Sequence, residues 1–508
     1  MTGPNAFPSP QGAPDGAAAR RKVSSYIALI PVCLGVFIAA DDQTVVVTVL
    51  PRMMVDLGVQ VTELDHASWS ITGYLLGYLA AMPLIGRLSD AWGHRRMFIL
   101  SMLLFMAGSA AVALSGSLDW LIAMRVVQAV GAGALVPVSI AIAGDLFPSG
   151  QRAIPYGIIG ASAEAGGVIG PLWGGLIIDR LDWQWVFWIN LPLAALTLAL
   201  LVMLLAPSPH REARIDFLGG ALLTVSLSAL TLALSLIPDV DAWMVGLFAV
   251  SAASLAAFIA RQRGFPEPLL PLSLFATRAF SASNAVHMLV GAALIIGMVT
   301  VPLMANTVMA LTPLEGGLWL MRMTAAIAVG GVLGGLAGRW LDWRLPAVTG
   351  LVLSAAGYYL MSGWDTTIAD PQLTAHLALA GLGFGLLIAP IALAATETVG
   401  EDRRGVASAT VTSMRIVGMT LGLAALAAWG SDRFFNLTGS LRLPLAIPGE
   451  TPAETLQRQM EFDAQLKAAG VSLFQDFFLI AMALCLLAVI PALWMSTANA
   501  RRAGRRSS

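Results

Sequence analysis

The sequence predicts an all-α membrane protein made of two homologous six-helix repeats and two linker helices, with fourteen transmembrane helices in total. Of the 508 residues, 57% are hydrophobic and only 12% are charged, which is too little polar side chain to cover a soluble protein of this size. The chain also repeats itself 252 positions later, where Gly86 and Asp90 recur as Gly338 and Asp342. Repeated membrane halves are typical of secondary transporters, whose substrate site lies between the repeats.

Apolar stretches of about 20 residues, long enough to cross a bilayer as a helix, occur fourteen times. They lie near 25–48, 67–86, 97–115, 119–143, 155–177, 186–206, 217–237, 243–261, 280–304, 314–338, 346–363, 372–396, 405–430 and 472–495. The repeat relates the first span to the ninth and the fifth to the thirteenth, so the seventh and eighth form an inserted linker. We therefore expect the following division: a disordered cytoplasmic tail over 1–23, bundles over 24–208 and 266–497, a linker over 209–265, and a basic cytoplasmic tail over 498–508.

The basic residues fix the expected orientation. Twenty Lys and Arg residues fall on one side of the spans, six fall on the other, and three lie within spans. By the positive-inside rule both termini are cytoplasmic, in a multi-pass protein of the plasma membrane. Cys33 and Cys485 lie in apolar spans, where we expect packing residues and no disulfide or metal site.

The second repeat carries an insertion over 431–471, in the last extracytoplasmic loop. Within it Leu456, Met460, Ala464 and Leu466 lie near helical spacing. This pattern predicts that the final helix extends beyond the bilayer; the alternative is an irregular loop.

Four motifs follow one another along the chain. Gly86 to Arg96 reads GRLSDAWGHRR, Arg125 to Gly133 reads RVVQAVGAG, Gly166 to Gly175 reads GGVIGPLWGG, and Trp183 to Pro192 reads WQWVFWINLP. In this order they resemble the second-to-third-helix loop, the fourth-helix motif, the fifth-helix antiporter motif and the start of the sixth helix in the fourteen-span drug:proton antiporter group of the major facilitator superfamily. The resemblance implies the major facilitator fold and transport driven by the proton gradient, without another cofactor.

The first-helix segment refines this resemblance. Asp42 to Pro51 reads DQTVVVTVLP, with Val47 where the drug-antiporter group usually has Asn. Together with YLLGYLAAMPLIGRLSD over 74–90 and SMRIVGM over 413–419, it looks more like the mycobacterial efflux proteins that export triacylglycerol and related lipids. Those proteins are also similar in having extended helices on the outer side. The resemblance implies a lipid as an alternative to a drug substrate.

Six ionisable residues lie inside the predicted spans: Asp41, Asp42, Glu164, Arg125, Arg322 and Arg415. An uncompensated charge at a helix centre costs about 2.5–3.5 kcal/mol, so such residues face a cavity or a partner. We interpret Asp42 as a proton-coupling site, because a carboxyl group in a partly dry cavity can exchange protons near physiological pH. The alternative is a permanently ionised partner of a structural arginine. Successive residues of a helix point about 100° apart, so Asp41 and Asp42 cannot face the same way. Asp41 is a further candidate for proton coupling; alternatively, it is the ion-pair partner of the arginine, or it caps a break in the helix.

The remaining charges leave alternatives open. Glu164 is interpreted as a second proton-coupled or substrate-coupled acid, or as an ion-pair partner of Arg415 or Arg125. Arg415 aligns with position 163 under the repeat, which places it opposite Glu164 across the halves. The family resemblance implies that Arg125 tunes the proton site, whereas the simpler interpretation is a packing anchor. Arg322 lies about two turns inside its span and could reach outward instead of acting directly.

Two further groups of residues are candidates for conformational change. The fifth-helix motif supplies small residues and a bend that permit a close, mobile seam or simple packing: Gly166, Gly170, Pro171, Gly174 and Gly175. The charged loop resembles an inner gate latch, although a solvated charge cluster is the simpler interpretation: Gly86, Arg87, Asp90, Gly93, Arg95, Arg96 and, in the neighbouring loop, Arg152. His287 and His376 are expected to be hydrogen-bonded packing residues more often than proton relays.

Three function classes follow. A proton-coupled exporter of lipophilic compounds, drugs or lipids, agrees with the motifs and repeats. A membrane acyltransferase is disfavoured, because none of the five histidines begins an H-x-x-x-x-D pair and no nucleotide loop occurs. A non-transporting scaffold or sensor would be favoured by loss of the buried acids, which are present. We expect a monomer in the lipid bilayer with a lipophilic small molecule or lipid as ligand, an extracytoplasmic lipid acceptor as a further candidate partner, and no nucleic acid.

Overall fold

The structure is a computed structural model that describes residues 25–60, 63–147, 153–206, 216–236, 241–266, 268–396, 404–441 and 451–495. These residues form fourteen long α-helices and a 3-10 helix, η4 (Leu272–Ala276). The α-helices are α2 (Ser25–Asp56), α3 (Leu64–Trp92), α4 (His94–Ala113), α5 (Leu118–Leu146), α6 (Ala153–Ile178), α7 (Gln184–Leu204), α8 (Phe217–Ser235), α9 (Ala242–Gly264), α10 (Arg278–Thr307), α11 (Pro313–Trp340), α12 (Arg344–Met361), α13 (Gln372–Thr396), α14 (Arg404–Thr438) and α15 (Pro452–Ala492).

The helices coincide with the fourteen predicted segments, so the predicted all-α class is confirmed. Thirteen of them are long and apolar enough to span a membrane. The other described helix is α12, which has 18 residues, begins at Arg344 and packs on α13 and α15. We use "outer end" for the end of the molecule that is predicted to be extracytoplasmic.

The two repeats use the same packing scheme. In the first, α2 packs on α6 and α7, and α5 on α3 and α4; in the second, α10 packs on α14 and α15, and α13 on α11 and α12. Repeat-related glycines make the closest approaches. Gly166 faces the backbone of Phe37 in α2, and Gly418 faces the backbone of Met288 in α10. A Cβ atom at either glycine would collide with that backbone, so these glycines set the distance between the helices.

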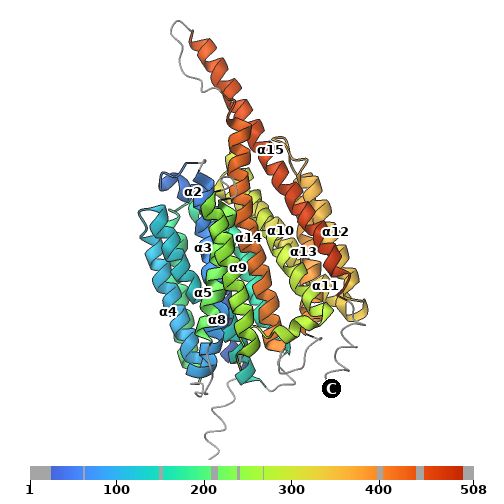
Figure 1. Ribbon diagram of the computed structural model, residues 1–508. Helices are drawn as coiled ribbons and strands as arrows, with labels where there is room; N and C mark the ends of the chain where they lie inside the picture. The colour runs from blue at the N-terminus through green and yellow to red at the C-terminus, as the bar shows by residue number, and fades with distance from the viewer. Residues whose placement is uncertain are drawn as a thin grey trace, which may run out of the picture.

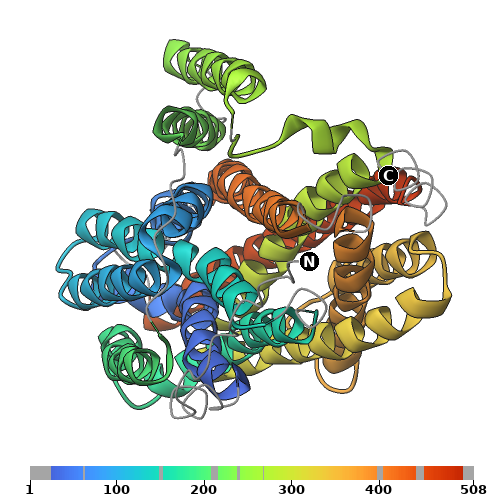
Figure 2. The same ribbon diagram turned by 90° about the horizontal axis from the view of Figure 1, so that it is seen from below.

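The helices α8 and α9 lie to one side of the two bundles (Figure 2). α8 packs on α9 and also on α3 and α14, which belong to different repeats. The base of this hairpin is held by Asp216, which accepts hydrogen bonds from Gly219 N at 2.9 Å, Arg261 Nε at 2.5 Å and Gln262 Nε2 at 2.8 Å. Desolvation opposes ionisation of Asp216, but the hydrogen bonds from Arg261, Gly219 and Gln262 outweigh it, so the pKa of Asp216 lies below its usual value.

The last helix, α15, has 41 residues and rises above the other helices at the outer end (Figure 1). It starts with a capping box, in which the Thr451 hydroxyl accepts from Glu454 N and the Glu454 carboxylate accepts from Thr451 N, with Pro452 in the first turn. At 1.5 Å per residue α15 is about 60 Å long, roughly twice the thickness of the hydrocarbon core. The helical conformation predicted for this part of the insertion is confirmed over 452–471, where the alternative of an irregular loop is wrong. Residues 442–450 of the insertion lie outside the described residues.

Candidate functional site

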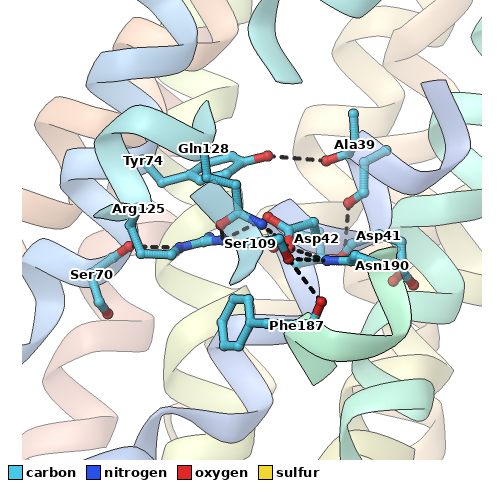
Figure 3. Close-up of polar contacts among 12 residues, drawn as sticks. Ala39, Asp41, Asp42, Ser70, Tyr74, Ser109, Arg125, Gln128, Phe187 and Asn190 are labelled. Atoms are coloured by element: carbon cyan, nitrogen blue, oxygen red, sulfur yellow. Dashed lines mark hydrogen bonds and ion pairs between the residues drawn. The ribbon is translucent and has the colours of Figure 1, made fainter. Parts of the chain in front are cut away.

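A buried polar cluster lies between α2, α4, α5 and α7, with Asp42 at its centre (Figure 3). Arg125 of α5 donates from Nη1 to Asp42 Oδ2 at 2.6 Å. Gln128, one turn further along α5, accepts from Arg125 Nη1 at 2.8 Å and donates to Asp42 Oδ1 at 2.8 Å. Asn190 of α7 donates to the same Oδ1 at 2.7 Å. Asp42 is therefore held by an arginine and two side-chain amides.

The surroundings of Arg125 complete this cluster. Its guanidinium lies 3.9 Å from the centroid of the Tyr74 ring, and its Nε donates to the Ser70 carbonyl at 3.4 Å. Asn190 also contacts the Ser109 hydroxyl of α4 at 3.2 Å. Both Asp42 and Arg125 are 0% exposed. Removing one member of such a buried pair costs about 3–5 kcal/mol, because the other charge is left without compensation.

These contacts bear directly on the interpretation of Asp42. The structure shows the alternative arrangement, in which Asp42 is the ion-pair partner of an arginine, and that arginine is Arg125. The role of Asp42 in proton coupling stays a prediction. Sequence reasoning did not identify Gln128, Asn190, Ser109 or Tyr74 as members of the site. Gln128 and Asn190 are uncharged polar residues inside predicted spans. A search that included uncharged polar residues as well as charged ones would have selected them.

Asp41 has a different environment from its neighbour. It is 8% exposed, and its Oδ1 has no hydrogen-bond partner within the described residues. Its carboxylate points away from the cluster around Arg125 (Figure 3). The backbone carbonyl of Asp41 accepts from the Thr44 hydroxyl at 3.2 Å. Thus Asp41 is not the observed partner of Arg125, and the two neighbouring carboxylates of α2 have different surroundings.

The glycines of the fifth-helix motif face two different helices. Gly166, Gly170 and Gly174 lie against α2; a Cβ at Gly170 would be 2.9 Å from the Asp41 carbonyl oxygen and would meet the Thr44 hydroxyl. Gly175 instead lies against the start of α11, in the other repeat, and the Pro171 carbonyl lies against Gly317 of α11. The motif therefore forms a close seam within the first repeat and, near its outer end, between the repeats.

Glu164 lies on α6, but its side chain is outside the described residues. Arg415 lies on α14, where its backbone carbonyl packs against Gly291 of α10. Because α14 packs on α3 of the first repeat as well as on α10 of the second, Arg415 lies on a helix at the interface between the repeats. The ion pair of Glu164 with Arg415 stays a prediction.

Arg322 contacts residues at the start of α13, and its role stays a prediction. From α11 its Nη1 donates to Asp370 Oδ1 at 2.8 Å and to the Thr374 hydroxyl at 2.9 Å. The hydrogen bond from Thr374 and the charge of Arg322 hold the pKa of Asp370 below its usual value.

The two intramembrane histidines make packing hydrogen bonds: His287 Nδ1 lies 2.8 Å from the Val411 carbonyl, and His376 Nδ1 accepts from Trp364 Nε1 at 3.0 Å.

The inner gate latch is described only in part. Gly93 separates α3 from α4 with φ at 93°, a left-handed value that glycine adopts readily. Gly86 packs near Pro137 of α5, and Arg95 donates to the Val202 carbonyl at 3.0 Å, while Arg96 is exposed. His94, which sequence reasoning did not select, lies 2.6 Å from Asp145.

The latch itself stays a prediction. The side chains of Arg87 and Asp90, and the whole of Arg152, lie outside the described residues.

Two packed repeats of membrane helices with a linker pair, together with charges buried inside the first repeat, are typical of a secondary transporter. Residues 32–423 match the Major Facilitator Superfamily, and the chain belongs to this family. It is accordingly a multi-pass membrane transporter and not an enzyme.

Similar proteins include several mycobacterial transporters. A triacylglyceride transporter of Mycolicibacterium hassiacum is 34% identical over 502 residues, covering 94% of this chain and 93% of that protein. A triacylglyceride transporter of Mycobacteroides abscessus is 36% identical over 446 residues, covering 84% of this chain and 87% of that protein. A triacylglyceride transporter of Mycobacterium tuberculosis is 34% identical over 489 residues, covering 91% of this chain and 93% of that protein. The predicted resemblance to this mycobacterial group is thereby confirmed, and its members are named triacylglyceride transporters.

Solved structures show the same fold. A bacterial homologue of the human lysosomal transporter Spinster, in an inward-facing and unoccupied conformation, has a TM-score of 0.64 at 16% identity and covers 94% of this chain and 99% of that one. A D-xylose–proton symporter has a TM-score of 0.61 at 13% identity, covering 89% and 97%.

Proposed function

We propose that the protein is a proton-coupled exporter of lipophilic compounds, with acylglycerol-type lipids as its substrates, that works by alternating access in the cytoplasmic membrane. The observation that carries this proposal is the pair of carboxylates buried on α2, Asp41 and Asp42, of which Asp41 lies beside the glycine seam of α6. Ionisable groups at this depth are costly and are kept where they serve transport. Glu164 on α6 is a further candidate acid on the same seam.

The lipid class is supported by the relatives and by α15. The mycobacterial relatives are named triacylglyceride transporters and align along nearly the whole chain. The protruding part of α15 carries Leu456 and Met460, one helical turn apart and 56% and 58% exposed. An apolar edge outside the bilayer suits the transfer of a lipid to an extracytoplasmic acceptor, which we propose as the partner of this segment.

Alternating access is supported by where the repeats meet. Gly175 packs on Leu314 and Pro313, and Pro171 packs on Gly317, at the outer part of α6 and α11. Closure here separates the central carboxylates from the outer side. Rocking of the repeats would open this contact and close the inner end, where Arg87, Asp90 and Arg152 are the candidate latch.

A multidrug exporter is the competing function, and it is favoured by the fifth-helix antiporter motif, Gly166 to Gly175. The deciding experiment uses proteoliposomes with an imposed pH gradient, a fluorescent diacylglycerol or triacylglycerol, and a panel of cationic dyes. We expect gradient-driven movement of the acylglycerol, lost in Glu164→Gln and kept in Gly160→Ala, whose added methyl group meets nothing within 4 Å.

Movement of the dyes alone would refute the lipid assignment. Movement of neither substrate class would refute export and favour a scaffold or sensor.

A further inference from the structure

We infer that the outer end of the second repeat binds a fatty-acid-type anion, with its alkyl chain in an apolar cavity and its carboxylate at Lys467. The inference goes beyond the proposed function, whose substrates are uncharged acylglycerols. The cavity is also separate from the cluster around Asp42, because it is formed by the second repeat and that cluster lies in the first.

The cavity has a volume of about 200 Å³ and lies where α15 rises above the other helices (Figure 1). Its walls come from the turn between α10 and α11, from α11, from the loop between α12 and α13, and from α15. They include Met309, Leu311, Trp319, Thr366, Ile368 and Lys467. Most of these side chains are apolar, so the cavity favours hydrocarbon.

Gly470 fixes the place where α15 leaves the bundle. A Cβ at Gly470 would be 3.0 Å from Val308 Cγ2, so glycine lets α15 lie directly on the end of α10. Residues 469 and 470 are buried, whereas 463–468 are exposed. Lys467 lies three residues before Gly470 and therefore on the same face of α15. This face carries the Lys467 side chain to the exposed edge of the cavity.

The turn between α10 and α11 holds one wall in place. Ala310 has φ at 53°, a left-handed value that residues other than glycine rarely adopt. Hydrogen bonds on both sides keep this turn closed: Met309 N donates to the Met304 carbonyl at 3.1 Å, and Leu311 N donates to the Ala305 carbonyl at 3.0 Å. The turn thereby presents Met309 and Leu311 to the cavity.

Trp319 forms a second fixed wall. Its ring packs edge-on against Trp364 with 5.8 Å between the centroids. Trp364 donates from Nε1 to His376 Nδ1 at 3.0 Å, and its carbonyl accepts from Gln475 Nε2 of α15 at 2.7 Å. Because these contacts already order the aromatic side chains, a ligand meets a preformed surface and binding costs little additional ordering.

The corresponding place in the first repeat lacks this aromatic wall. Under the offset of 252 residues Ala310 aligns with Gly58, whose φ is 68°, so both repeats contain the left-handed turn. Trp319, however, aligns with Ala67. The turn is therefore part of the repeated architecture, whereas the aromatic wall is a property of the repeat that carries the extended α15.

Size limits the ligand to a single chain. Drug-sized ligands occupy pockets of about 300–1,000 Å³, and one water molecule occupies about 30 Å³ of liquid. A cavity of about 200 Å³ therefore admits part of one alkyl chain. It is too small for an acylglycerol with three chains, so it is not a second copy of the proposed substrate site.

Charge specifies the head group. Lys467 forms no ion pair within the part of the chain that the structure describes. A lysine ammonium group binds carboxylate as a point charge. Asp365 of the neighbouring loop is directed at Thr367, whose backbone N and hydroxyl donate to it at 2.7 and 2.6 Å. An anionic head group at Lys467, with its chain on the apolar walls, satisfies both features of the cavity.

The first test is protection of Lys467 from reductive methylation, in the full-length protein in phosphatidylcholine nanodiscs. The sequence has one other lysine, Lys22, which is the internal control. We expect dodecanoate to slow methylation of Lys467 about tenfold at ten times its Kd, and to leave Lys22 unchanged. Dodecanol, which has the same chain without the charge, should protect neither lysine. Methylation of Lys467 at the same rate with and without dodecanoate would overturn the inference.

Variants give a second readout with a fatty acid that carries a photoreactive diazirine near its methyl end. We expect crosslinks within 308–319, lost in Lys467→Gln and kept in Lys467→Arg, which retains the charge. Thr366→Trp should fill the cavity and abolish crosslinking at an unchanged melting temperature, because Thr366 is exposed. Equal crosslinking in Lys467→Gln and Lys467→Arg would overturn the carboxylate contact.

A last comparison checks the single-chain assignment. Protection of Lys467 by an anionic phospholipid and not by dodecanoate would overturn it. All three measurements report binding and not transport, so failure of this inference and failure of the proposed export are distinguishable.

Discussion

Replacement of Gly175 by alanine tests the contact between the repeats. An added Cβ would lie 2.8 Å from the Leu314 Cα and 3.1 Å from the Pro313 carbonyl oxygen. Carbon atoms in van der Waals contact prefer about 3.5–4.0 Å. Because both neighbours are backbone atoms, they cannot swing aside, and α6 and α11 must separate at their outer ends by roughly 1 Å.

The size of the effect follows from overpacking. A methyl group forced into a filled contact costs about 1–3 kcal/mol. Under the proposed alternating access this contact exists only while the outer end is closed, so the cost falls on that conformation. We therefore expect Gly175→Ala to shift the equilibrium toward the outward-open conformation by a factor of about 5–150.

The assay is a distance measurement between spin labels at the outer ends of α6 and α11, in a background without the free cysteines Cys33 and Cys485. We expect a larger population at long distance in Gly175→Ala. Gly160→Ala, on the same helix, should match wild type because nothing lies within 4 Å of its added methyl group. Identical distance distributions in all three proteins would refute the steric reasoning.

Three further predictions concern stability. Asn190→Ala removes a buried hydrogen bond to the Asp42 carboxylate and should lower the free energy of unfolding by about 1.5–3 kcal/mol; an unchanged melting temperature would contradict the described cluster. The lowered pKa of Asp216 means that its charge stabilises the folded protein above pH 4 and that this contribution is lost as the pH falls further. Asp216→Asn should therefore melt below wild type at pH 7, and the gap should close on acidification below pH 4; a gap independent of pH would refute the ionic contribution. Thr451→Ala removes the cap of α15 and should cost its first turn about 1 kcal/mol, seen as faster amide hydrogen exchange over 452–456; unchanged exchange there would argue against the capping box.

Much of the fold could be predicted because membrane helices are specified locally. An apolar run of sufficient length suffices for a span, and all fourteen predicted segments correspond to helices. The repeat then predicts which helices pack together, as Gly166 and Gly418 show. The capping box at Thr451 and Glu454 is also readable in the sequence. The exact start of α15 was missed because hydropathy locates the bilayer, whereas capping residues locate the end of a helix.

The charged members of the site could be predicted, but neither their pairing nor the uncharged members could. Charge inside a span selects Asp41, Asp42 and Arg125, but which aspartate faces Arg125 depends on the rotation of α2 against α5. That rotation is set by packing across the whole bundle. Asn190 lies 148 positions from Asp42 and meets it only because α7 packs on α2. No local pattern carries that information.

Proton-coupled lipid export is tested most directly by measuring acylglycerol movement and proton movement simultaneously in one population of proteoliposomes containing the wild-type protein. We predict that an outward acylglycerol gradient drives protons inward, and that an imposed proton gradient drives the lipid outward. Lipid movement that is indifferent to the proton gradient would contradict the coupling.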